Sequence, residues 1–208
     1  MEDIAWEAMI SQYLVQKLHI SINSMEIRSW DASSMDEIYD EDYDIIVNCT
    51  GLGSYQLFND GSMYPIRGQI LQVKAPHVKL GYKYWFAEDD RISYILLNHD
   101  HVCVGGKYQF GNWSKHEDPT DTKSILENAQ AVLPALKNIK IDAVKVGLRP
   151  GRSAVRLESE MCKIGSKTIP VVHNYGHGGS GVTLCWGCAD DASNMVVNAA
   201  KTKSKSRL

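Results

Sequence analysis

The chain has 208 residues, 44% of them hydrophobic and 23% charged, which is the composition of an ordinary globular protein with enough residues for a substantial core. Its formal net charge of -3 gives no reason to expect nucleic acid or an anionic membrane as a partner. No apolar run approaches the roughly 20 residues that a membrane-spanning helix needs, and the acidic start Met1-Glu2-Asp3 is unlike a signal peptide. We therefore expect a soluble protein that is not secreted and whose five cysteines are reduced.

The spacing of apolar residues predicts an alternation of helices and strands. An amphipathic helix is expected over residues 5–18 and a short, buried, parallel strand at 45–47. The later elements are strands at residues 66–73, 92–97, 101–105, 143–148 and 169–173, a helix at 123–136 and a long final helix from about 181 to 201. Asn98-His99-Asp100 suits a hairpin turn between two of these strands. The middle strands interrupt the α/β pattern, which predicts a nucleotide-type α/β domain with an inserted, mostly antiparallel α+β sheet domain.

The strongest chemical signal is the glycine-rich segment HNYGHGGSGVT at residues 173–183, placed between a predicted strand and the final helix. Its glycines let the backbone approach a ligand closely, and the helix N-terminus favours an anion or a polarised carbonyl. Such a loop is also found as a simple turn, so this remains a hypothesis. We expect His173 and His177 to form hydrogen bonds within the loop rather than to bind zinc.

The amino-acid sequence of this loop and its continuation, HNYGHGGSGVTLCWGCA, resembles the signature of the D-amino-acid oxidase family. Further blocks in the family's order are VNCTG at 47–51, RGQILQVKAP at 67–76, GNW at 111–113, VGLRP at 146–150 and VRLE at 155–158. The resemblance implies an FAD-dependent enzyme, built as a partial Rossmann-like FAD-binding domain with an inserted substrate domain. Three of the blocks, CTGLGS, RGQILQV and VGLRP, are nearer to the D-aspartate oxidase branch.

On the basis of the resemblance, the chain is divided into four segments. We expect a partial FAD-binding domain at residues 1–62, a substrate and interface domain at 63–148, a returning FAD-binding segment at 149–200 and a basic tail at 201–208. The family begins with a strand and a G-x-G-x-x-G turn that receives the pyrophosphate. The first glycine here is Gly51, so the chain is expected to lack that N-terminal unit.

The resemblance also implies the roles of individual residues. Arg149 is expected to bind the substrate α-carboxylate with two hydrogen bonds, although a surface ion pair is the ordinary alternative for an arginine. Tyr94 is expected to contact the same carboxylate, or else to be a core tyrosine, and the Gly179 carbonyl to accept from the substrate amine. The residues expected near FAD are Ile27, Thr50, Gly51, Gly178, Gly179, Ser180, Gly181, Val182 and Thr183, with residues 67–69 lining the same region.

The implied reaction is oxidative deamination of a D-amino acid, with dioxygen as the second substrate and hydrogen peroxide, ammonia and a 2-oxo acid as products. No residue is expected to be catalytic beyond those that align the substrate, and no metal is expected. The substrate is either D-aspartate or a neutral D-amino acid. Where the D-aspartate branch has an arginine two residues after a Gly-Gly pair, this chain has Gly105-Gly106-Lys107-Tyr108; Lys107 or Arg91 is the remaining source of positive charge.

Three further expectations come from shorter segments. Cys185 and Cys188 form a C-x-x-C pair that a thiol oxidoreductase would use, but their place in the family's final helix favours packing. The C-terminal Ser206-Arg207-Leu208 is a variant of the peroxisomal signal, which predicts import into peroxisomes through their receptor. Homodimer formation stays open. The competing interpretation is a truncated, non-catalytic relative that does not hold FAD.

Overall fold

The computed structural model describes residues 43–87 and 91–205, which form two compact units. One unit consists of Met1–Tyr64 and Pro150–Leu208, and the other of Pro65–Arg149. The second unit is inserted in the sequence of the first, and we call it the insert; the sequence alone placed it at 63–148. Three expected features lie outside the described residues: the helix at 5–18, the cofactor contact Ile27 and the tripeptide Ser206-Arg207-Leu208.

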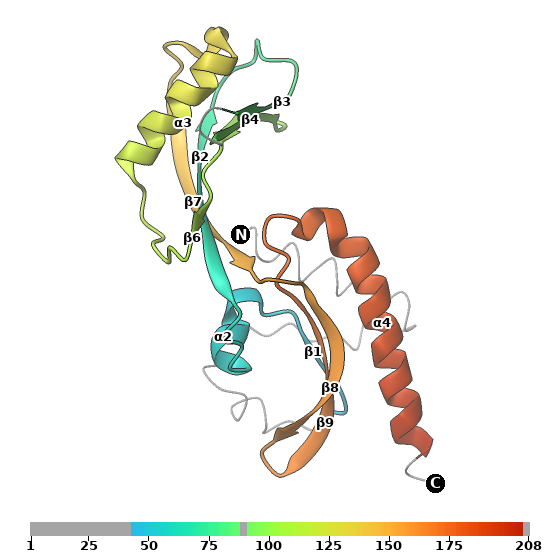
Figure 1. The fold of residues 1–208 in the computed structure, drawn as a ribbon. Helices are drawn as coiled ribbons and strands as arrows, with labels where there is room; N and C mark the ends of the chain where they lie inside the picture. The colour runs from blue at the N-terminus through green and yellow to red at the C-terminus, as the bar shows by residue number, and fades with distance from the viewer. Residues whose placement is uncertain (1–42, 88–90, 206–208) are drawn as a thin grey trace. The chain divides into compact units, whose positions relative to one another are not determined.

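The outer unit is built on a three-stranded sheet in the order β1-β9-β8 (Figure 1). Strand β1 (Ile46–Asn48) pairs in parallel with β9 (Lys167–Tyr175), with Val47 opposite Val172, which confirms the predicted parallel strand, although Ile46 and Val47 are half-buried rather than buried. Strand β8 (Arg156–Ile164) pairs antiparallel with β9. The sequence analysis did not predict β8, because its residues are mostly exposed and polar and carry no apolar alternation.

Short helices and one long helix complete this unit. The 3-10 helix η3 (Gly51–Gly53) and the helix α2 (Ser54–Leu57) follow β1, and α4 (Gly181–Lys205) follows β9 and lies along β8 and β9 (Figure 1). The core under the sheet contains Ile164, Ile169 and Val171, with Ile46 and Phe58 packed against them. None of the helices in the described part of the chain offers the apolar length of a membrane span.

The insert contains a six-stranded sheet in the order β3-β4-β5-β2-β6, with β7 also paired to β2. The strands are β2 (Tyr64–Val73), β3 (Tyr82–Phe86), β4 (Arg91–Leu97), β5 (Val102–Gly105), β6 (Gln109–Phe110) and β7 (Ile141–Gly151). Strand β4 pairs antiparallel with β3 and β5, and β2 pairs antiparallel with β5 and β6. The predicted β4–β5 hairpin is confirmed, and its turn is closed by the Asn98 N–H donating to the His101 carbonyl at 2.9 Å.

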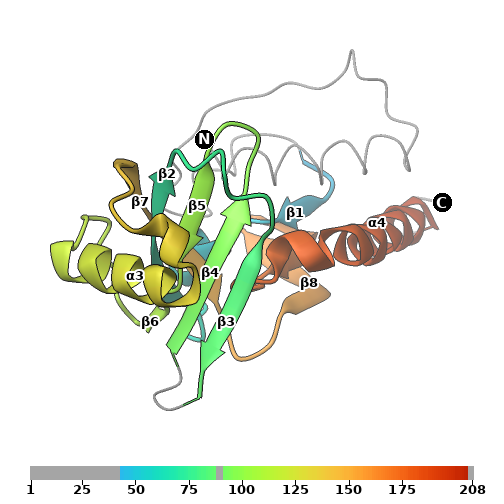
Figure 2. The same ribbon diagram turned by 90° about the horizontal axis from the view of Figure 1, so that it is seen from above.

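One face of the insert's sheet is buried beneath α3 (Pro119–Val132), which packs against β4 and β5 (Figure 2). Helix α3 begins at Pro119 rather than at residue 123, because the Asp118 side chain accepts from the Thr120 N–H at 2.8 Å and caps the helix. It ends at Val132 because Pro134 starts a 3-10 turn, η4 (Pro134–Leu136). The core on this face consists of Leu71, Val73, Ile95, Val104, Ile125 and Ala129.

The opposite face of this sheet has no helix of the described insert upon it, and we call it the open face. Side chains on a strand alternate between the two faces, so Leu71 and Val73 of β2 point to α3, whereas Gly68 and Ile70 point to the open face. Tyr94 and Gly105 belong to the open face as well, because the register pairs Ile70 with Gly105 and Gly105 with Tyr94.

Candidate active site

Arg149, near the end of β7, lies on the open face of the insert with its guanidinium pressed against β2. A Cβ atom built on Gly68 would lie 2.2 Å from Arg149 Nη1, which shows how closely the guanidinium approaches the backbone. The guanidinium carbon lies 4.7 Å from the centre of the Tyr108 ring. Nη1 makes a long hydrogen bond of 3.5 Å to the Lys107 carbonyl, the side chain also shares a hydrogen bond with Tyr94, and no carboxylate of the described residues pairs with it. The described residues therefore offer no ion pair of the kind that is the ordinary alternative, and the guanidinium keeps donors for a ligand.

Tyr94 lies on the same face, on β4. Its hydroxyl and Cζ atom would both be 2.4 Å from a Cβ atom on Gly105, so the ring lies flat on a strand without a side chain at that position. Burial raises the pKa of the Tyr94 hydroxyl, while the charge of Arg149 and a hydrogen bond with it act in the opposite direction. The structure thus brings together Tyr94 and Arg149, the two predicted carboxylate contacts. With a raised pKa, Tyr94 is a hydrogen-bond donor at neutral pH.

The two basic residues considered as receptors for a side-chain carboxylate are both engaged elsewhere. Lys107 Nζ lies 3.5 Å from Asp121 Oδ1, so its charge is compensated by a buried carboxylate. Arg91 donates to Asn128 Oδ1 of α3 and stacks over Phe86, with 4.7 Å between its guanidinium carbon and the ring centre. Position 108, two residues after the Gly105-Gly106 pair, holds the uncharged ring of Tyr108.

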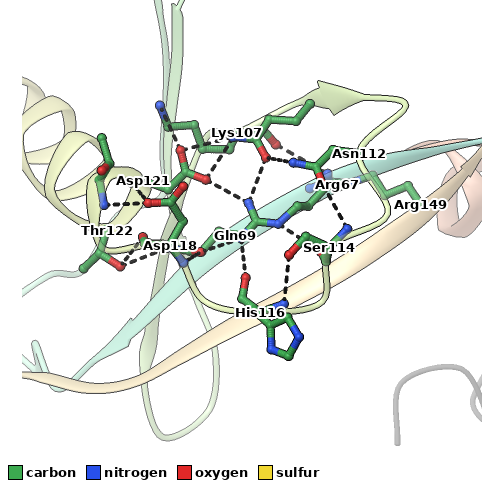
Figure 3. Close-up of polar contacts among 12 residues, drawn as sticks. Arg67, Gln69, Lys107, Asn112, Ser114, His116, Asp118, Asp121, Thr122 and Arg149 are labelled. Carbon is green, nitrogen blue, oxygen red and sulfur yellow. Dashed lines mark hydrogen bonds and ion pairs between the residues drawn. The ribbon is translucent and has the colours of Figure 1, made fainter.

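Beside Arg149, on the α3 side of β2, lies a buried polar network centred on Arg67 (Figure 3). Every N–H group of the Arg67 guanidinium has an acceptor: the side chains of Gln109, Asp121 and Gln69 at 2.8 to 2.9 Å and the carbonyls of Ser114 and His116 at 3.0 and 2.7 Å. These bonds leave the Arg67 side chain no donor for a cofactor. Arg67 therefore differs from the expectation that residues 67–69 line the FAD site.

Gln69 extends the same network to the start of α3. Its amide nitrogen donates to the Asp118 carbonyl at 2.9 Å and to the Thr122 hydroxyl at 2.8 Å (Figure 3). Its amide oxygen accepts from the Asp118 N–H at 2.9 Å. Arg67 and Gln69 together fix strand β2 to α3 and to the loop before it.

In the outer unit, two predicted ligand-binding segments follow the carboxyl ends of neighbouring strands. Thr50 and Gly51 come directly after β1, and the glycine-rich loop comes directly after β9, which is parallel to β1. The two segments therefore lie at the same edge of the sheet, which is where open α/β sheets bind ligands. Asn48 Oδ1 accepts from the Thr50 N–H at 3.0 Å and from its hydroxyl at 2.8 Å, and Gly51 has a φ of 55° that favours glycine.

The glycine-rich loop itself is tightly turned and leads into α4. Gly176 and Gly178 have φ angles of 87° and 57°, the Gly178 N–H donates to the Pro150 carbonyl at 2.8 Å, and the Ser180 N–H donates to the His177 carbonyl at 3.0 Å. Two buried side-chain atoms here, Asn174 Oδ1 and His177 Nε2, have no hydrogen-bond partner among the described residues. The predicted contacts in this loop are half-buried at Gly178 and Gly181 and exposed at Gly179, Ser180, Val182 and Thr183.

The prediction that both histidine side chains form hydrogen bonds within the loop is wrong. His173 is fully buried and contacts two other strands: Nε2 lies 2.9 Å from Glu160 Oε1 on β8, and Nδ1 lies 3.0 Å from Asn48 Nδ2 on β1. The amide of Asn48 donates, so Nδ1 accepts and the proton sits on Nε2, facing Glu160. Burial, the largest cause, lowers the pKa of His173, and burial also lowers the pKa of His177.

Glu160, Cys162 and His173 have ligand-type atoms within 4.8 Å of one another, which raises the question of a metal. Three observations weigh against one. The proton on His173 Nε2 occupies the position a metal would need, Arg156 Nη2 already pairs with Glu160 Oε1 at 2.9 Å, and burial raises the pKa of the Cys162 thiol to about 11. This group is therefore better described as a hydrogen-bonded cluster that joins the strands.

The lowered pKa values of His173 and His177 predict a loss of stability in mild acid. An unfolded chain takes up protons on these residues below about pH 6.5, whereas the folded chain resists protonation until lower pH, so the free energy of unfolding falls as the pH falls from about 7.5 to about 5.5. Glu160, whose pKa is lowered, contributes only below this window. Urea unfolding at the two pH values measures the effect. His177→Asn should reduce the pH dependence.

All five cysteines are free thiols. In the C-x-x-C pair, Cys185 Sγ donates to the Val182 carbonyl at 3.1 Å, and burial raises the pKa of Cys188. A redox-active dithiol needs a lowered pKa, so these features agree with a packing role for the pair.

Comparison with known proteins identifies a family and several relatives. The family model "FAD dependent oxidoreductase" (DAO) matches residues 22–195. The chain is 43% identical to a D-amino acid oxidase of Dugesia ryukyuensis over 84% of this chain and 51% of the relative, and 40% identical to the D-aspartate oxidase of Homo sapiens over 77% and 47%. The chain thus spans about half the length of the curated relatives it matches.

Solved structures show the same fold. Glycine oxidase from Bacillus cereus ATCC 14579 superimposes with a TM-score of 0.61 and 21% identity, covering 74% of this chain and 42% of that one. Glycerol-3-phosphate dehydrogenase from Bacillus halodurans, complexed with FAD, superimposes with a TM-score of 0.52 and 19% identity over 76% and 32%. Since the family model covers most of the sequence, this chain belongs to the DAO family of FAD-dependent oxidoreductases.

Proposed function

We propose that this chain carries the substrate-recognising insert and part of the FAD-binding domain of an oxidase that converts D-amino acids to 2-oxo acids, ammonia and hydrogen peroxide. The observation that carries the proposal is Arg149, which is half-buried, unpaired with any described carboxylate and directed to the same face as Tyr94. A planar guanidinium and a phenol that stays protonated are together suited to an α-carboxylate. The D-amino-acid and D-aspartate oxidases among the relatives support this assignment.

The residues of the outer unit fit a bound flavin nucleotide. Asn174 Oδ1 and His177 Nε2 are buried polar atoms in need of partners, and the first N–H groups of α4 lack intrahelical acceptors. Together with Thr50, Gly51 and residues 178–183, they offer donors and acceptors at the ligand-binding edge of the sheet. FAD, when bound, supplies the acceptor for the hydride that leaves the substrate Cα. The insert's own contribution is to hold the substrate carboxylate at Arg149 and Tyr94.

We further propose that the preferred substrate is a neutral rather than an acidic D-amino acid. Lys107, whose carbonyl accepts a hydrogen bond from Arg149, has its ammonium group paired with Asp121, and the neighbouring position presents the Tyr108 ring. A second substrate carboxylate would have to compete with a buried aspartate for Lys107. An uncharged side chain faces no such competition and gains contact with the aromatic ring.

The absorption spectrum of the purified chain mixed with FAD tests the proposed function. We expect a flavin band perturbed by the protein that bleaches on anaerobic addition of D-alanine and bleaches more slowly with D-aspartate. The faster reaction with D-alanine follows from the pairing of Lys107 with Asp121. Faster bleaching by D-aspartate would overturn the preference alone. A spectrum identical to that of free FAD would instead favour a family member that does not hold the cofactor.

The C-terminal Ser206-Arg207-Leu208 supports a proposal of peroxisomal import, which suits an enzyme that releases hydrogen peroxide. We expect a fluorescent protein fused in front of the chain to collect in peroxisomes and to lose that location when Leu208 is deleted. Retention after the deletion would contradict the role of this tripeptide.

A further inference from the structure

We propose that Gly68 and Gly105 are positioning residues of the carboxylate site: two strand positions without side chains determine where the Arg149 guanidinium and the Tyr94 ring lie. The inference rests on the proposed function for its meaning in catalysis. Its geometric part rests on the insert alone, because all four residues belong to that unit.

The first observation is the closeness of the guanidinium to β2. A Cβ atom on Gly68 would lie 2.2, 2.6 and 2.7 Å from Nη1, Nη2 and Cζ of Arg149. All three distances are far shorter than ordinary van der Waals contact, and the two terminal nitrogens lie closer than Cζ, so the Nη1–Nη2 edge of the guanidinium faces the backbone of Gly68. A residue with any side chain at this position forces the guanidinium to move away from the strand.

The second observation is that strand β2 cannot retreat to make room. Arg67 and Gln69, on either side of Gly68, point to the opposite face and are both almost fully buried. Their side chains hold the strand to Asp121 and Thr122 of α3 and to the loop before the helix. In the sequence Arg67-Gly68-Gln69, the two outer side chains hold one face of the strand to α3 and its preceding loop, while Gly68 places no side chain on the other face.

The third observation is that the neighbouring strand repeats the arrangement for the tyrosine. A Cβ atom on Gly105 would lie 2.4 Å from both Cζ and the hydroxyl oxygen of Tyr94, and 2.6 Å from Cε2. Gly105 is paired with Ile70, which is two residues beyond Gly68 on the same face of β2. Both predicted carboxylate contacts thus lie on glycines of adjacent strands.

Gly147 shows that a close side-chain contact is not common to every glycine of this sheet. Gly147 lies on β7, two residues before Arg149, and a Cβ atom there would meet nothing within 4 Å. Gly147→Ala is therefore a matched control for Gly68→Ala: the same chemical change in the same sheet, without a contact to the guanidinium.

The experiment follows the Arg149 side chain by NMR and by ligand titration. The signal of the Arg149 Hε proton is assigned by its loss in Arg149→Lys. In the wild type we expect the Tyr108 ring to shift this signal away from the chemical shift of a free arginine. Gly68→Ala should move that signal towards the position of a free arginine, while the rest of the spectrum stays that of the folded protein, because the end of an arginine side chain can swing away. Gly147→Ala should leave it in place. An unmoved Arg149 signal in folded Gly68→Ala would overturn the inference.

Titration with D-alanine in the presence of FAD adds the functional readout. We expect Gly68→Ala to weaken binding at least about tenfold, since one of two charge-assisted hydrogen bonds is lost, and Gly147→Ala to bind as the wild type does. Gly105→Ala should weaken it as well, through Tyr94, and provides a second variant if Gly68→Ala fails to fold. Wild-type binding that Gly68→Ala and Gly105→Ala both preserve would overturn the inference. A wild type that binds no D-alanine would contradict the proposed function, while the Arg149 signal still decides the packing.

Discussion

Replacing Arg149 by alanine is expected to reduce the rate of flavin reduction by D-alanine, at subsaturating substrate, by about a hundredfold or more. Two charge-assisted hydrogen bonds to the α-carboxylate would be lost, each worth about 1.5–3 kcal/mol. Arg149→Lys should recover only part of the rate, because an ammonium cannot reproduce the planar two-pronged contact or the stacking on Tyr108. Stopped-flow absorbance under anaerobic conditions measures this rate directly.

The matched control for this experiment is Lys123→Ala. Lys123 lies on α3 in the same unit, is largely exposed and pairs loosely with Glu127 at 3.9 Å. Removing its charge should leave the rate unchanged, so a general electrostatic effect on an anionic substrate can be separated from direct binding. If Arg149→Ala reduced the rate no more than Lys123→Ala does, the carboxylate site would have to be sought elsewhere.

The second large effect is expected for Arg67→Ala, which should destabilise the insert by about 3–5 kcal/mol. The substitution leaves Asp121 as a buried carboxylate without its arginine and removes the donors to the Ser114 and His116 carbonyls. Breaking a buried ion pair by removing one partner is strongly destabilising, even where the pair itself contributes little compared with apolar residues. The free energy of unfolding from urea titration, followed by tryptophan fluorescence, gives the value.

Arg67→Met is a useful companion to this variant, because it fills more of the volume that alanine leaves empty but supplies no donor. Similar losses in both would assign the effect to the hydrogen bonds that Asp121 and the two carbonyls lose with Arg67, rather than to a cavity. A loss below about 1 kcal/mol in Arg67→Ala, the range of an exposed pair such as Lys123–Glu127, would contradict the structural role given to the network.

The sequence was most informative where local patterns decide the structure. Alternation and an Asn-His-Asp turn predicted the β4–β5 hairpin, and a short apolar run predicted β1. Helix α3 was placed too late because the Asp118-Pro119 start signal was overlooked, and polar β8 was missed because its position depends on pairing with β9. The start of α3 could have been predicted from neighbouring residues, whereas β8 depends on pairing with a distant strand, which local patterns do not indicate.

The environment of individual side chains was much harder to predict. His173 contacts Asn48, which is 125 residues away in the sequence, and Arg67 contacts groups 42 to 54 residues away, so no local pattern indicates either cluster. The assignment of Arg149 and Tyr94 to one site came from the resemblance to the family's sequence motifs. The structure adds that the two residues share one face of a sheet. The roles of the residues in the glycine-rich loop stay predictions that ligand binding has to test.

The alternation of strand β2 has a consequence for directed evolution of this protein. Random changes at Arg67 and Gln69 will mostly be removed by selection for folding, since their bonds hold α3 and its preceding loop. Positions on the other face, such as Ile70 and the exposed Leu96, carry no such burden and border the proposed site. A library that varies such positions and leaves Gly68 and Gly105 unchanged would explore substrate range while most variants still fold. Alternate residues of one strand thus differ in the substitutions they tolerate.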